Sequence, residues 1–428
     1  MQSIIYPGNI DGIIFAPASK SCMQRACAAA LLHEGETIIH HKGSSEDDLT
    51  ALEIVKQLGA IVIEQSNGDL FITGKKQFQH SPLANPSIIN CNESGLALRM
   101  FAPIIAMQSS ASVITGKGSL MQRPIDPFLQ IFPLLGVSID TNNGKLPITI
   151  QGPIKPTDIE IEGSSSSQYL TGLLFALAKL SLEPLRIKVN NLISTPYVDL
   201  TLEILEHFGY NIVNEGNQYF TIHPTTPVTS IIEYTIEGDW SGASFLLVAG
   251  AVAGSIEIKG LNVQSKQADK SILQVLNTTG ARLSISDESI KIEKPIGNKK
   301  LLPFNFDATH CPDLFPPLVA LAAYCDGISV IEGVDRLSGK ESNRAKSLQD
   351  TFAVFGVKID LQDNLMIIHG GGEIRGGNVS SCNDHRIAMS AAIVGLKSTN
   401  KVIIEDAQVV NKSYPNFFKD ISSVFKIK

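Results

Sequence analysis

The sequence lacks any long apolar run and any excess of positive charge. No uninterrupted apolar stretch approaches the roughly 20 residues that a membrane-spanning helix needs. The first residues, MQSIIYPGNIDGIIF, have no basic segment followed by a long apolar one, as a secretory signal would. The formal net charge at pH 7 is −7, which argues against a surface for nucleic acid or anionic membranes. We therefore expect a cytoplasmic protein without either kind of partner.

Paired cysteines are also missing. The chain has six cysteines but no Cys-x-x-Cys pair, a pattern that indicates reduced thiols and predicts no zinc site. Charged residues make up 18% of the 428 residues and hydrophobic residues 43%, which argues against disorder. A chain of this length can form two or more domains with a large core.

One pattern recurs five times along the chain. In each copy an apolar helix ends at a glycine, and two short alternating strands follow around a polar turn, as in FGVKIDLQDNLMIIHGG. Glycine suits the left-handed position after a helix, and these glycines are Gly59, Gly136, Gly209, Gly280 and Gly356. Their spacings are 77, 73, 71 and 76 residues, which leaves room for a sixth unit that would combine the two termini. Three units per domain predict two similar α/β domains, and binding sites often lie between domains.

Four consecutive serines precede an apolar run in GSSSSQYLTGLLFALA, residues 163–178. Leu170, Leu173, Leu174 and Leu177 have the spacing of one buried helix face, so the serines lie at a helix start. One serine suffices as a cap, whereas several hydroxyls and free backbone N–H groups would also bind an anion such as phosphate. Taken alone, the stretch is also typical of a flexible linker that ends in a cap.

Basic residues stand beside predicted helix starts or turns throughout this acidic chain. They are Lys20, Arg25, Arg123, Lys340, Arg344, Arg386 and Lys412. The spacing of Lys340 and Arg344 predicts that both lie on one helix face, where like charges repel unless an anion lies between them. Each motif by itself also fits a solvated polar face. Because equivalent ends of repeated units can converge, the whole set predicts an electropositive pocket for phosphorylated, carboxylated small molecules.

Polar residues also stand at two predicted helix starts. Asp313 precedes a buried helix and by itself is most simply a helix cap. Asn383 or Asp384 would cap the helix that follows them, but a cap does not explain why His385 is followed by Arg386. Taken singly, each of these motifs is a weak signal of function.

Taken in order, these motifs resemble those of the 5-enolpyruvylshikimate-3-phosphate synthases, also called 3-phosphoshikimate 1-carboxyvinyltransferases. The resemblance covers nearly the whole chain, and the ordered set is far more specific than any single motif. The matching residues are Lys20-Ser21-x3-Arg25, Arg123-Pro124, Ser166-Ser167-Gln168, Ser194-x2-Tyr197, Asp239, Pro312-Asp313, Lys340-Glu341-x2-Arg344, Asn383-Asp384-His385-Arg386 and Lys412.

The resemblance implies an α/β fold, a two-domain inside-out α/β barrel with three βαβαββ units per domain. This agrees with the repeat counted above. It also implies that the chain crosses between domains twice, near residues 18–20 and 225–235. One domain would comprise residues 20–227, the other residues 1–19 and 228–428, and the active site would lie in the cleft between them.

The reaction implied by the resemblance moves the enolpyruvyl group of phosphoenolpyruvate to the 5-hydroxyl of shikimate-3-phosphate and releases phosphate, in the shikimate pathway of aromatic amino acid biosynthesis. It passes through a tetrahedral intermediate, uses no metal or organic cofactor, and is carried out by a monomer. The residues implied to bind shikimate-3-phosphate are Lys20, Ser21, Arg25, Ser166, Ser167, Gln168, Ser194, Tyr197, Asp313 and Lys340. Those implied to bind phosphoenolpyruvate are Lys20, Gly95, Arg123, Gln168, Arg344, His385, Arg386 and Lys412.

Two proton transfers are required by this chemistry. Asp313 is the candidate base for the 5-hydroxyl proton, Glu341 is the candidate acid for the methylene carbon of phosphoenolpyruvate, and Lys20 is a further candidate for proton transfer. Glu341 lies between Lys340 and Arg344 in the sequence, which favours its ionised form. The negative charge of the substrate would have to keep a proton on it.

The chain departs from the family pattern at several positions. The usual Asn-Ala-Gly-Thr stretch reads Glu93-Ser94-Gly95-Leu96, which puts an acid beside an anion site and removes a hydroxyl. Arg336 stands where Asn is usual, and Asn343 where Asp is usual. Contacts of Gly95 with phosphoenolpyruvate are still expected, whereas the sequence leaves open how these changes affect the response to glyphosate, which competes at this place in the family.

Three other functions are alternatives. A related transferase that acts on UDP-N-acetylglucosamine typically has a reactive cysteine before its Arg-Pro, whereas TGKGSLMQRP, residues 115–124, has none. A non-catalytic relative would bind phosphorylated metabolites without releasing phosphate. An RNA-modifying relative would need a more basic surface.

Overall fold

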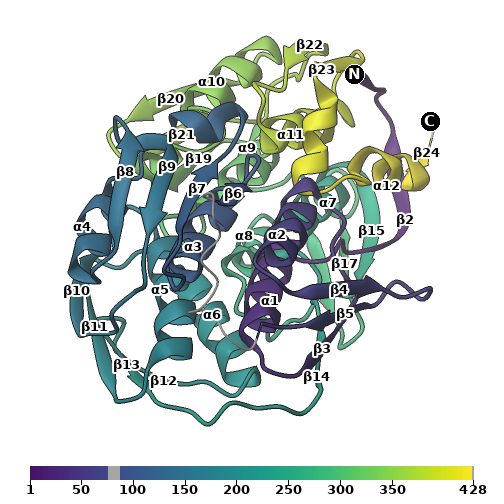
Figure 1. Cartoon of the computed structure of the whole chain (residues 1–428). Coiled ribbons are helices and arrows are strands. Elements are labelled where there is room, and N and C mark those ends of the chain that lie inside the picture. Colours follow the sequence, from purple (N-terminus) through teal and green to yellow (C-terminus); the bar gives the residue numbers. More distant parts are fainter. Residues whose placement is uncertain (76–86, 427–428) are drawn as a thin grey trace. The chain divides into compact units, whose positions relative to one another are not determined.

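The structure is a computed structural model that describes residues 1–75 and 87–426 (Figure 1). It divides into two compact units. Unit 1 consists of Met1–Ser19 and Glu237–Lys428, and unit 2 of Lys20–Ile236. The predicted second boundary, 227/228, differs from the observed one because β14 (Ile232–Thr235) pairs in parallel with β3 (Glu36–His40) and so belongs to unit 2.

The described residues of unit 2 form three four-stranded sheets. Besides β3 and β14, its strands are β4 (Ile61–Glu64), β5 (Leu70–Thr73), β6 (Ser87–Asn90), β7 (Ala111–Thr115), β8 (Ser138–Asn142), β9 (Lys145–Gln151), β10 (Ile159–Glu162), β11 (Leu185–Asn190), β12 (Asn211–Glu215) and β13 (Tyr219–His223). The strand orders are β14-β3-β5-β4, β6-β7-β9-β8 and β10-β11-β13-β12. In each sheet the first pair is parallel and the other pairs are antiparallel.

Three helices form the centre of unit 2. They are α1 (Lys20–Leu32), α3 (Gly95–Ile105) and α5 (Ser167–Leu180), which contact one another. The other helices are α2 (Glu46–Gln57), the short 3-10 helix η1 (Gly118–Gln122), α4 (Asp126–Leu134) and α6 (Thr195–His207). Every residue of α1 from Cys22 onward is buried, whereas strand residues such as Ile61 and Ile88 are exposed. Helices inside and sheets outside are the predicted inside-out arrangement.

Unit 1 repeats this plan with strands from both ends of the chain. They are β1 (Ser3–Ile5), β2 (Asn9–Phe15), β15 (Gly254–Lys259), β16 (Arg282–Ile285), β17 (Ser289–Glu293), β18 (Asn305–Asp307), β19 (Ile328–Glu332), β20 (Lys358–Gln362), β21 (Leu365–His369), β22 (Gly377–Ser380), β23 (Val402–Glu405) and β24 (Phe425–Lys426). The sheet orders are β16-β17-β15-β2-β24, β18-β19-β21-β20 and β1-β23-β22. Because β1 pairs with β23, the sixth unit combines the two termini, as expected.

The helices at the centre of unit 1 are α7 (Trp240–Ala253), α9 (Phe315–Ala323) and α11 (His385–Gly395). All their residues are buried, and the three helices contact one another. The remaining helices are η2 (Ala268–Ser271), α8 (Ile272–Thr278), η3 (Pro312–Leu314), η4 (Val334–Leu337), α10 (Arg344–Val354), η5 (Ala407–Lys412) and α12 (Phe417–Val424). The starts of α9, α10 and α11 carry the acidic and basic motifs found in the sequence.

The five glycines of the repeat confirm the interpretation of the pattern. Their φ angles are all positive, from 72° at Gly136 to 105° at Gly59, a conformation that glycine adopts without the steric cost paid by other residues. Each glycine is followed by an antiparallel hairpin, from β4–β5 in the first copy to β20–β21 in the last.

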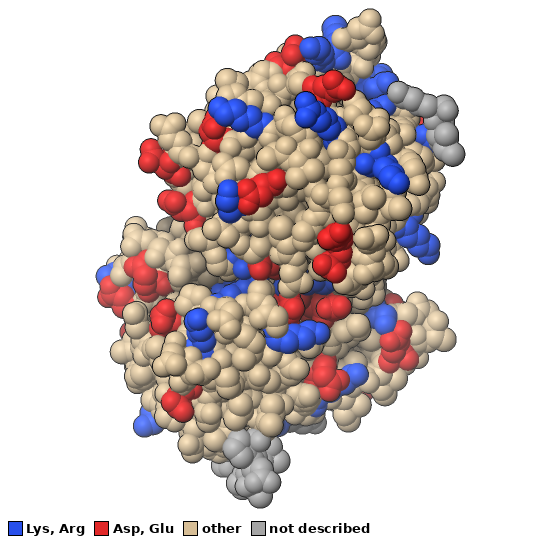
Figure 2. Space-filling view, turned by 90° about the horizontal axis from the view of Figure 1, so that it is seen from above, with Lys and Arg blue, Asp and Glu red and all other residues tan. Residues whose placement is uncertain are grey.

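Membrane segments and surface charge in the described residues are possible signs of a partner. In the described ranges, no helix is long and apolar enough to cross a membrane. Acidic and basic side chains are intermixed on the face shown in Figure 2. This distribution fits the modest net charge of −7.

Candidate active site

The serine stretch in unit 2 is a capped helix start, as predicted. Ser166 is the N-cap of α5, and its hydroxyl accepts a hydrogen bond from the backbone N–H of Gln168 at 3.2 Å. The four leucines of the predicted stripe are all buried. Ser167 and Gln168 therefore lie in the first turn, where backbone N–H groups lack helical partners.

Arg25 is a buried cation surrounded by neutral groups. It lies in α1 and is 1% exposed. Its guanidinium donates to the Thr201 hydroxyl at 2.9 Å and to the backbone oxygens of Ser21 at 2.8 Å and Tyr197 at 3.3 Å. Burial lowers its pKa to about 10. Buried charges are normally paired. Within the described ranges, the hydrogen bonds of this guanidinium go to uncharged oxygens, so it marks a place suited to an anionic ligand.

Helix α6 carries two of the predicted site residues at its start. The helix begins at Thr195, directly after Ser194, and Tyr197 lies in its first turn. The helix starts here because Pro196 is compatible with a first turn, where its missing N–H costs no helical bond. Ser194 precedes the helix with a positive φ of 55°. The start of α6 thus contacts Arg25, whose guanidinium donates a hydrogen bond to the Tyr197 backbone oxygen.

Two arginines converge on the start of α3. A Cβ atom placed on Gly95 would lie 2.9 Å from Arg123 Nη1 and 3.1 Å from Arg99 Nη1. Arg99 Nη1 donates to Gln168 Oε1 at 2.9 Å, so Gly95, Arg123 and Gln168 of the predicted site lie close together. Arg99 was absent from the predicted site residues, although its position one turn after Gly95 was a usable signal.

Glu93 is one of the departures from the family pattern. Its carboxylate lies against Gly118, where any side chain would collide with it. Ser94 caps α3 by accepting a hydrogen bond from the N–H of Ala97 at 3.3 Å.

Lys20, the first residue of α1, pairs with an acid that the sequence reasoning missed. Its Nζ lies 3.0 Å from Asp47 Oδ2. Asp47 is in the first turn of α2, which begins with a capping box between Ser45 and Asp48. The signal in the sequence was this Ser-x-x-acid pattern before an apolar helix.

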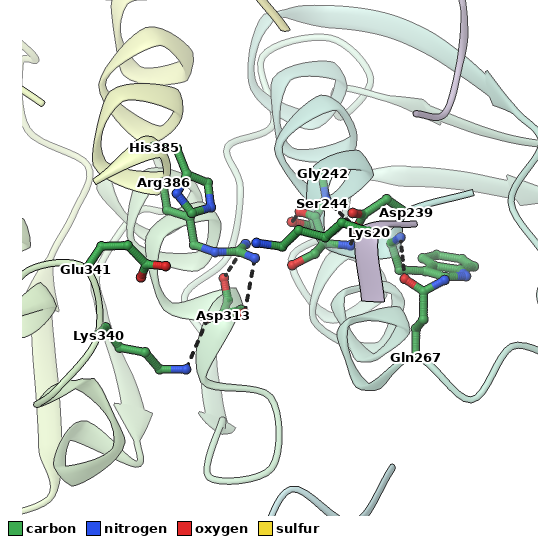
Figure 3. A network of polar contacts seen from close by, with 12 residues as sticks. Lys20, Asp239, Gly242, Ser244, Gln267, Asp313, Lys340, Glu341, His385 and Arg386 are labelled. Carbon is green, nitrogen blue, oxygen red and sulfur yellow. Dashed lines mark hydrogen bonds and ion pairs between the residues drawn. The ribbon is translucent and has the colours of Figure 1, made fainter. Parts of the chain in front are cut away.

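The acids and bases of unit 1 form a single network (Figure 3). Asp313 Oδ1 lies 2.8 Å from Arg344 Nη1 and 3.4 Å from Lys340 Nζ, and its Oδ2 lies 3.1 Å from Arg386 Nη2. Burial acts to raise the pKa of Asp313, but Arg386, Lys340 and Arg344 outweigh it and hold this pKa well below its usual range. Asp313 is therefore ionised at neutral pH. It lies within η3 and makes no side-chain cap, so it is not the simple helix cap that the sequence alone suggested.

Glu341 joins Arg344 to a further cation, Lys412, in the same network. Its Oε2 lies 2.6 Å from Arg344 Nη2, and its Oε1 lies 3.3 Å from Lys412 Nζ. Arg344 also pairs with Asp384 Oδ2 at 3.0 Å. Burial lowers the pKa of Arg344, but Asp384, Glu341 and Asp313 outweigh burial and raise it. Arg344 is thus the cation that joins three carboxylates.

The prediction that Lys340 and Arg344 share a helix face is wrong. Helix α10 begins only at Arg344, and Asn343 caps it by accepting a hydrogen bond from the N–H of Lys346 at 3.3 Å. Asn and Asp are comparably good caps, so this departure from the family pattern preserves the helix start. Lys340 lies in the preceding loop, and the two cations meet through Asp313.

The start of α11 resolves the choice of its cap. Asp384 is the N-cap, and its Oδ1 accepts a hydrogen bond from the N–H of Arg386 at 3.0 Å. His385 has a buried ring whose Nδ1 lies 3.9 Å from Asp384 Oδ1. Arg336, in η4, faces the same network: burial lowers its pKa, and the charge of Asp313 raises it.

The predicted site residues are divided between the two units. Unit 2 holds Lys20, Ser21, Arg25, Gly95, Arg123, Ser166, Ser167, Gln168, Ser194 and Tyr197. Unit 1 holds Asp313, Lys340, Glu341, Arg344, His385, Arg386 and Lys412. Among the described residues, no group of three or more His, Cys, Asp and Glu side chains has the arrangement of a metal site. Each unit thus contributes cations at the starts of its central helices.

The chain is similar over nearly its whole length to proteins of one known family. Residues 5–421 match the model of the EPSP synthase (3-phosphoshikimate 1-carboxyvinyltransferase) family. The chain belongs to this family. It is 35% identical to the 3-phosphoshikimate 1-carboxyvinyltransferase of Clostridium novyi over 99% of the chain and 98% of that protein. It is 34% identical to that of Methanocorpusculum labreanum, with the same two coverages.

Solved structures agree with this assignment. The EPSP synthase of Acinetobacter baumannii superposes with a TM-score of 0.81 at 25% identity, covering 100% of the chain and 98% of that structure. An enolpyruvyl transferase of Streptomyces tendae shares the fold, with a TM-score of 0.75 at 14% identity and coverages of 99% and 98%. The chain is therefore an enzyme of the shikimate pathway of aromatic amino acid biosynthesis. It transfers the enolpyruvyl group of phosphoenolpyruvate to shikimate-3-phosphate.

Proposed function

We propose that the two clusters of cations hold the two anionic substrates, and that the acids of unit 1 move the protons of the transfer reaction. The observation that supports this most directly is the burial of Arg25 among neutral oxygens. A phosphate group would supply the missing negative charge and accept charge-assisted hydrogen bonds.

Shikimate-3-phosphate is assigned mainly to unit 2. The 3-phosphate would be bound by Ser166 and Ser167 at the start of α5, where the helix dipole also favours an anion. The other proposed ligands of this substrate are Lys20, Ser21, Arg25, Gln168, Ser194, Tyr197, Asp313 and Lys340. Hydrogen bonds already link Arg25 to the backbone of Ser21 and Tyr197, which supports a shared role for these three residues.

Phosphoenolpyruvate is assigned to cations of both units. Its proposed ligands are Lys20, Gly95, Arg123 and Gln168 in unit 2, and Arg344, His385, Arg386 and Lys412 in unit 1. The absence of a side chain at Gly95 leaves space beside the Arg123 and Arg99 guanidiniums. Arginine suits this task because its planar fork matches the geometry of carboxylate and phosphate groups.

The proposed base, Asp313, is already in the ionised form that a base requires. Three cations make it a weak base in the free protein. A substrate phosphate or carboxylate that engages Arg386, Lys340 or Arg344 would weaken that stabilisation and make Asp313 more basic. It would then take the 5-hydroxyl proton as the oxygen attacks C2 of phosphoenolpyruvate.

Glu341 is the proposed acid, with Lys20 as a further group for proton transfer. Protonation of the methylene carbon of phosphoenolpyruvate completes the tetrahedral intermediate, and loss of a proton from the resulting methyl group expels phosphate. Glu341 is bound by Arg344 and Lys412 in the free protein, so it can hold a proton only when these cations are engaged by substrate. Fixed charges of this kind supply much of the stabilisation of a transition state.

The decisive experiment measures phosphate release with shikimate-3-phosphate and phosphoenolpyruvate, and with each substrate omitted. Release only when both are present supports the proposal. Release with UDP-N-acetylglucosamine as acceptor would identify the related transferase instead. Binding of both substrates without release would indicate a non-catalytic relative.

Two further properties are proposed. The enzyme acts as a monomer, which sedimentation at working concentration would test. It resides in the cytoplasm, as its six free cysteines suggest, and fractionation of the source cells would test this location.

A further inference from the structure

Two buried threonines lie on mostly apolar faces of helices in unit 2. Thr171 is in α5 and Thr201 is in α6, and both are 0% exposed. The other buried residues of α6 are apolar, as Val198 and Leu205 illustrate. Packing of such a face does not require a hydroxyl, and a buried hydroxyl costs free energy unless it is hydrogen-bonded. The hydrogen-bond partners of the two threonines therefore indicate what these side chains do.

The Thr201 hydroxyl is bonded to a buried cation. Its oxygen accepts a hydrogen bond from Arg25 Nε at 2.9 Å, and its proton is donated to the backbone oxygen of Tyr197 at 2.9 Å. The terminal nitrogens of the same guanidinium donate to the backbone oxygens of Ser21 and Tyr197. Acceptors at Nε and at both terminal nitrogens fix the plane of the guanidinium, because its donors form a rigid fork.

Thr171 connects this hydroxyl to the start of α5. The hydroxyl oxygens of Thr171 and Thr201 lie 3.2 Å apart, and Thr171 Oγ1 is also 3.2 Å from the backbone oxygen of Ser167. The single proton of Thr171 can be donated to either of these acceptors. Polar contacts thus run without a break from Ser167, a proposed ligand of the 3-phosphate, through both threonines to Arg25.

We propose that Thr201 is a positioning residue for Arg25, and that Thr171 holds the Thr201 hydroxyl in place. This inference rests on the proposed role of Arg25 in binding shikimate-3-phosphate. Within the described residues, each terminal nitrogen of Arg25 uses one N–H in the bonds above, and its other N–H can be donated to a phosphate oxygen. A guanidinium whose plane is already fixed loses less conformational freedom when the phosphate binds, and so binds it more tightly.

The test compares wild-type enzyme with Thr201→Val, which removes the hydroxyl and nearly keeps the shape of the side chain. We expect KM for shikimate-3-phosphate to rise about tenfold, as for the loss of one hydrogen bond to a charged group, and KM for phosphoenolpyruvate and kcat to change less than about twofold. Thr201→Ser restores an acceptor and should behave like wild type. A structural defect would not confine its effect to one substrate.

Thr37→Val is the matched control. Thr37 is also 0% exposed and belongs to unit 2, but its hydroxyl lies 3.1 Å from His33 Nδ1 and has no bond to Arg25 among the described residues. This variant loses a buried hydroxyl of the same kind, so it should leave both KM values unchanged. An equal rise of both KM values in Thr201→Val, or a rise in Thr201→Ser as large as in Thr201→Val, would overturn the proposal.

A double variant shows whether Thr201 acts through Arg25. Adding Thr201→Val to Arg25→Met should raise KM for shikimate-3-phosphate no further, and an additional rise would overturn the proposal. An unchanged KM in Thr201→Val, together with a raised KM in Arg25→Met, would overturn the positioning role and leave the assignment of Arg25 intact. An unchanged KM in Arg25→Met would overturn both.

Thr171→Val keeps the proposal testable if Thr201→Val does not fold. It removes the neighbouring hydroxyl and leaves the bond between Thr201 and Arg25 in place. A rise in KM for shikimate-3-phosphate alone would support the proposal. An unchanged KM for this substrate, or an equal rise of both KM values, would overturn it.

Discussion

Lys20 and Asp47 form an ion pair of 3.0 Å between the first turns of α1 and α2. The pair is largely buried, with side-chain exposures of 16% and 7%. A cation at the start of a helix is opposed by the helix dipole, and the Asp47 carboxylate offsets this effect. The pair therefore holds a candidate catalytic ammonium at a place where it would otherwise be unfavourable.

We expect Asp47→Asn to lower turnover by about tenfold, because Lys20 loses the charge that holds it in place. Steady-state kinetics of Asp47→Asn, Lys20→Met and the double variant measure the coupling. If Asp47 acts through Lys20, the double variant should be no worse than Lys20→Met. Glu46→Gln, an exposed change in the same helix turn, should behave like wild type. Additive losses in the double variant would argue for independent roles.

Asp313→Ala and Glu341→Ala are each expected to reduce turnover by about two to four orders of magnitude, the usual contribution of a general acid or base. Phosphate release under saturating substrates measures this loss. Because Asp313 and Glu341 are paired with cations, Asp313→Asn and Glu341→Gln separate the loss of the proton-transfer group from the loss of shape. Wild-type-like turnover in both Asp313 variants would show that Asp313 is not the base. The same result in both Glu341 variants would show that Glu341 is not the acid.

Arg25→Met should raise KM for shikimate-3-phosphate by at least about tenfold, a loss of about 1.4 kcal/mol of binding free energy. The free protein should lose little stability, since a buried cation without a carboxylate partner contributes little to folding. Thermal unfolding with and without inorganic phosphate is the second measurement. Phosphate should raise Tm of the wild type and not of Arg25→Met. Equal protection of both proteins would place the phosphate elsewhere.

Arg386→Lys keeps the charge but loses the forked donor that contacts Asp313 at 3.1 Å. We expect it to raise KM for phosphoenolpyruvate about tenfold or more and to leave KM for shikimate-3-phosphate nearly unchanged. Titration of each substrate at saturating levels of the other distinguishes the two effects. An increase in KM for shikimate-3-phosphate alone would instead indicate that Arg386 binds that substrate.

Asp48 should make the folded state less stable as pH rises. Burial raises its pKa to about 7, more than the Ser45 hydrogen bonds lower it, whereas an unfolded Asp titrates near about 4. Between these values the folded state binds more protons, so the free energy of unfolding falls with rising pH and levels off above about 7. Denaturant unfolding should show that Asp48→Asn gains stability over wild type as pH increases, and Glu46→Gln should not. A constant difference between Asp48→Asn and wild type would mean that Asp48 is ionised throughout.

The structural features that could be predicted from the sequence depend on local chemistry. The five glycines, the hairpins after them and the leucine stripe of α5 depend on short-range sterics and on periodic burial, and all were predicted. The ordered motifs also sufficed to recognise the family. The start of α10 was misjudged because Lys340 and Arg344 have helical spacing, whereas the Asn343 cap starts the helix only at Arg344.

Tertiary structure determined which residues that are distant in the sequence pair with one another. The sequence by itself determined the repeat, most of the helix starts and the residue types available for anion binding, because these depend on neighbours within a few positions. Only the folded chain determined that Asp313 meets Arg344 and Arg386, that Asp47 meets Lys20, and that Arg25 is buried among neutral oxygens. Ion pairing and burial depend on distance in space, and packing of the central helices sets that distance.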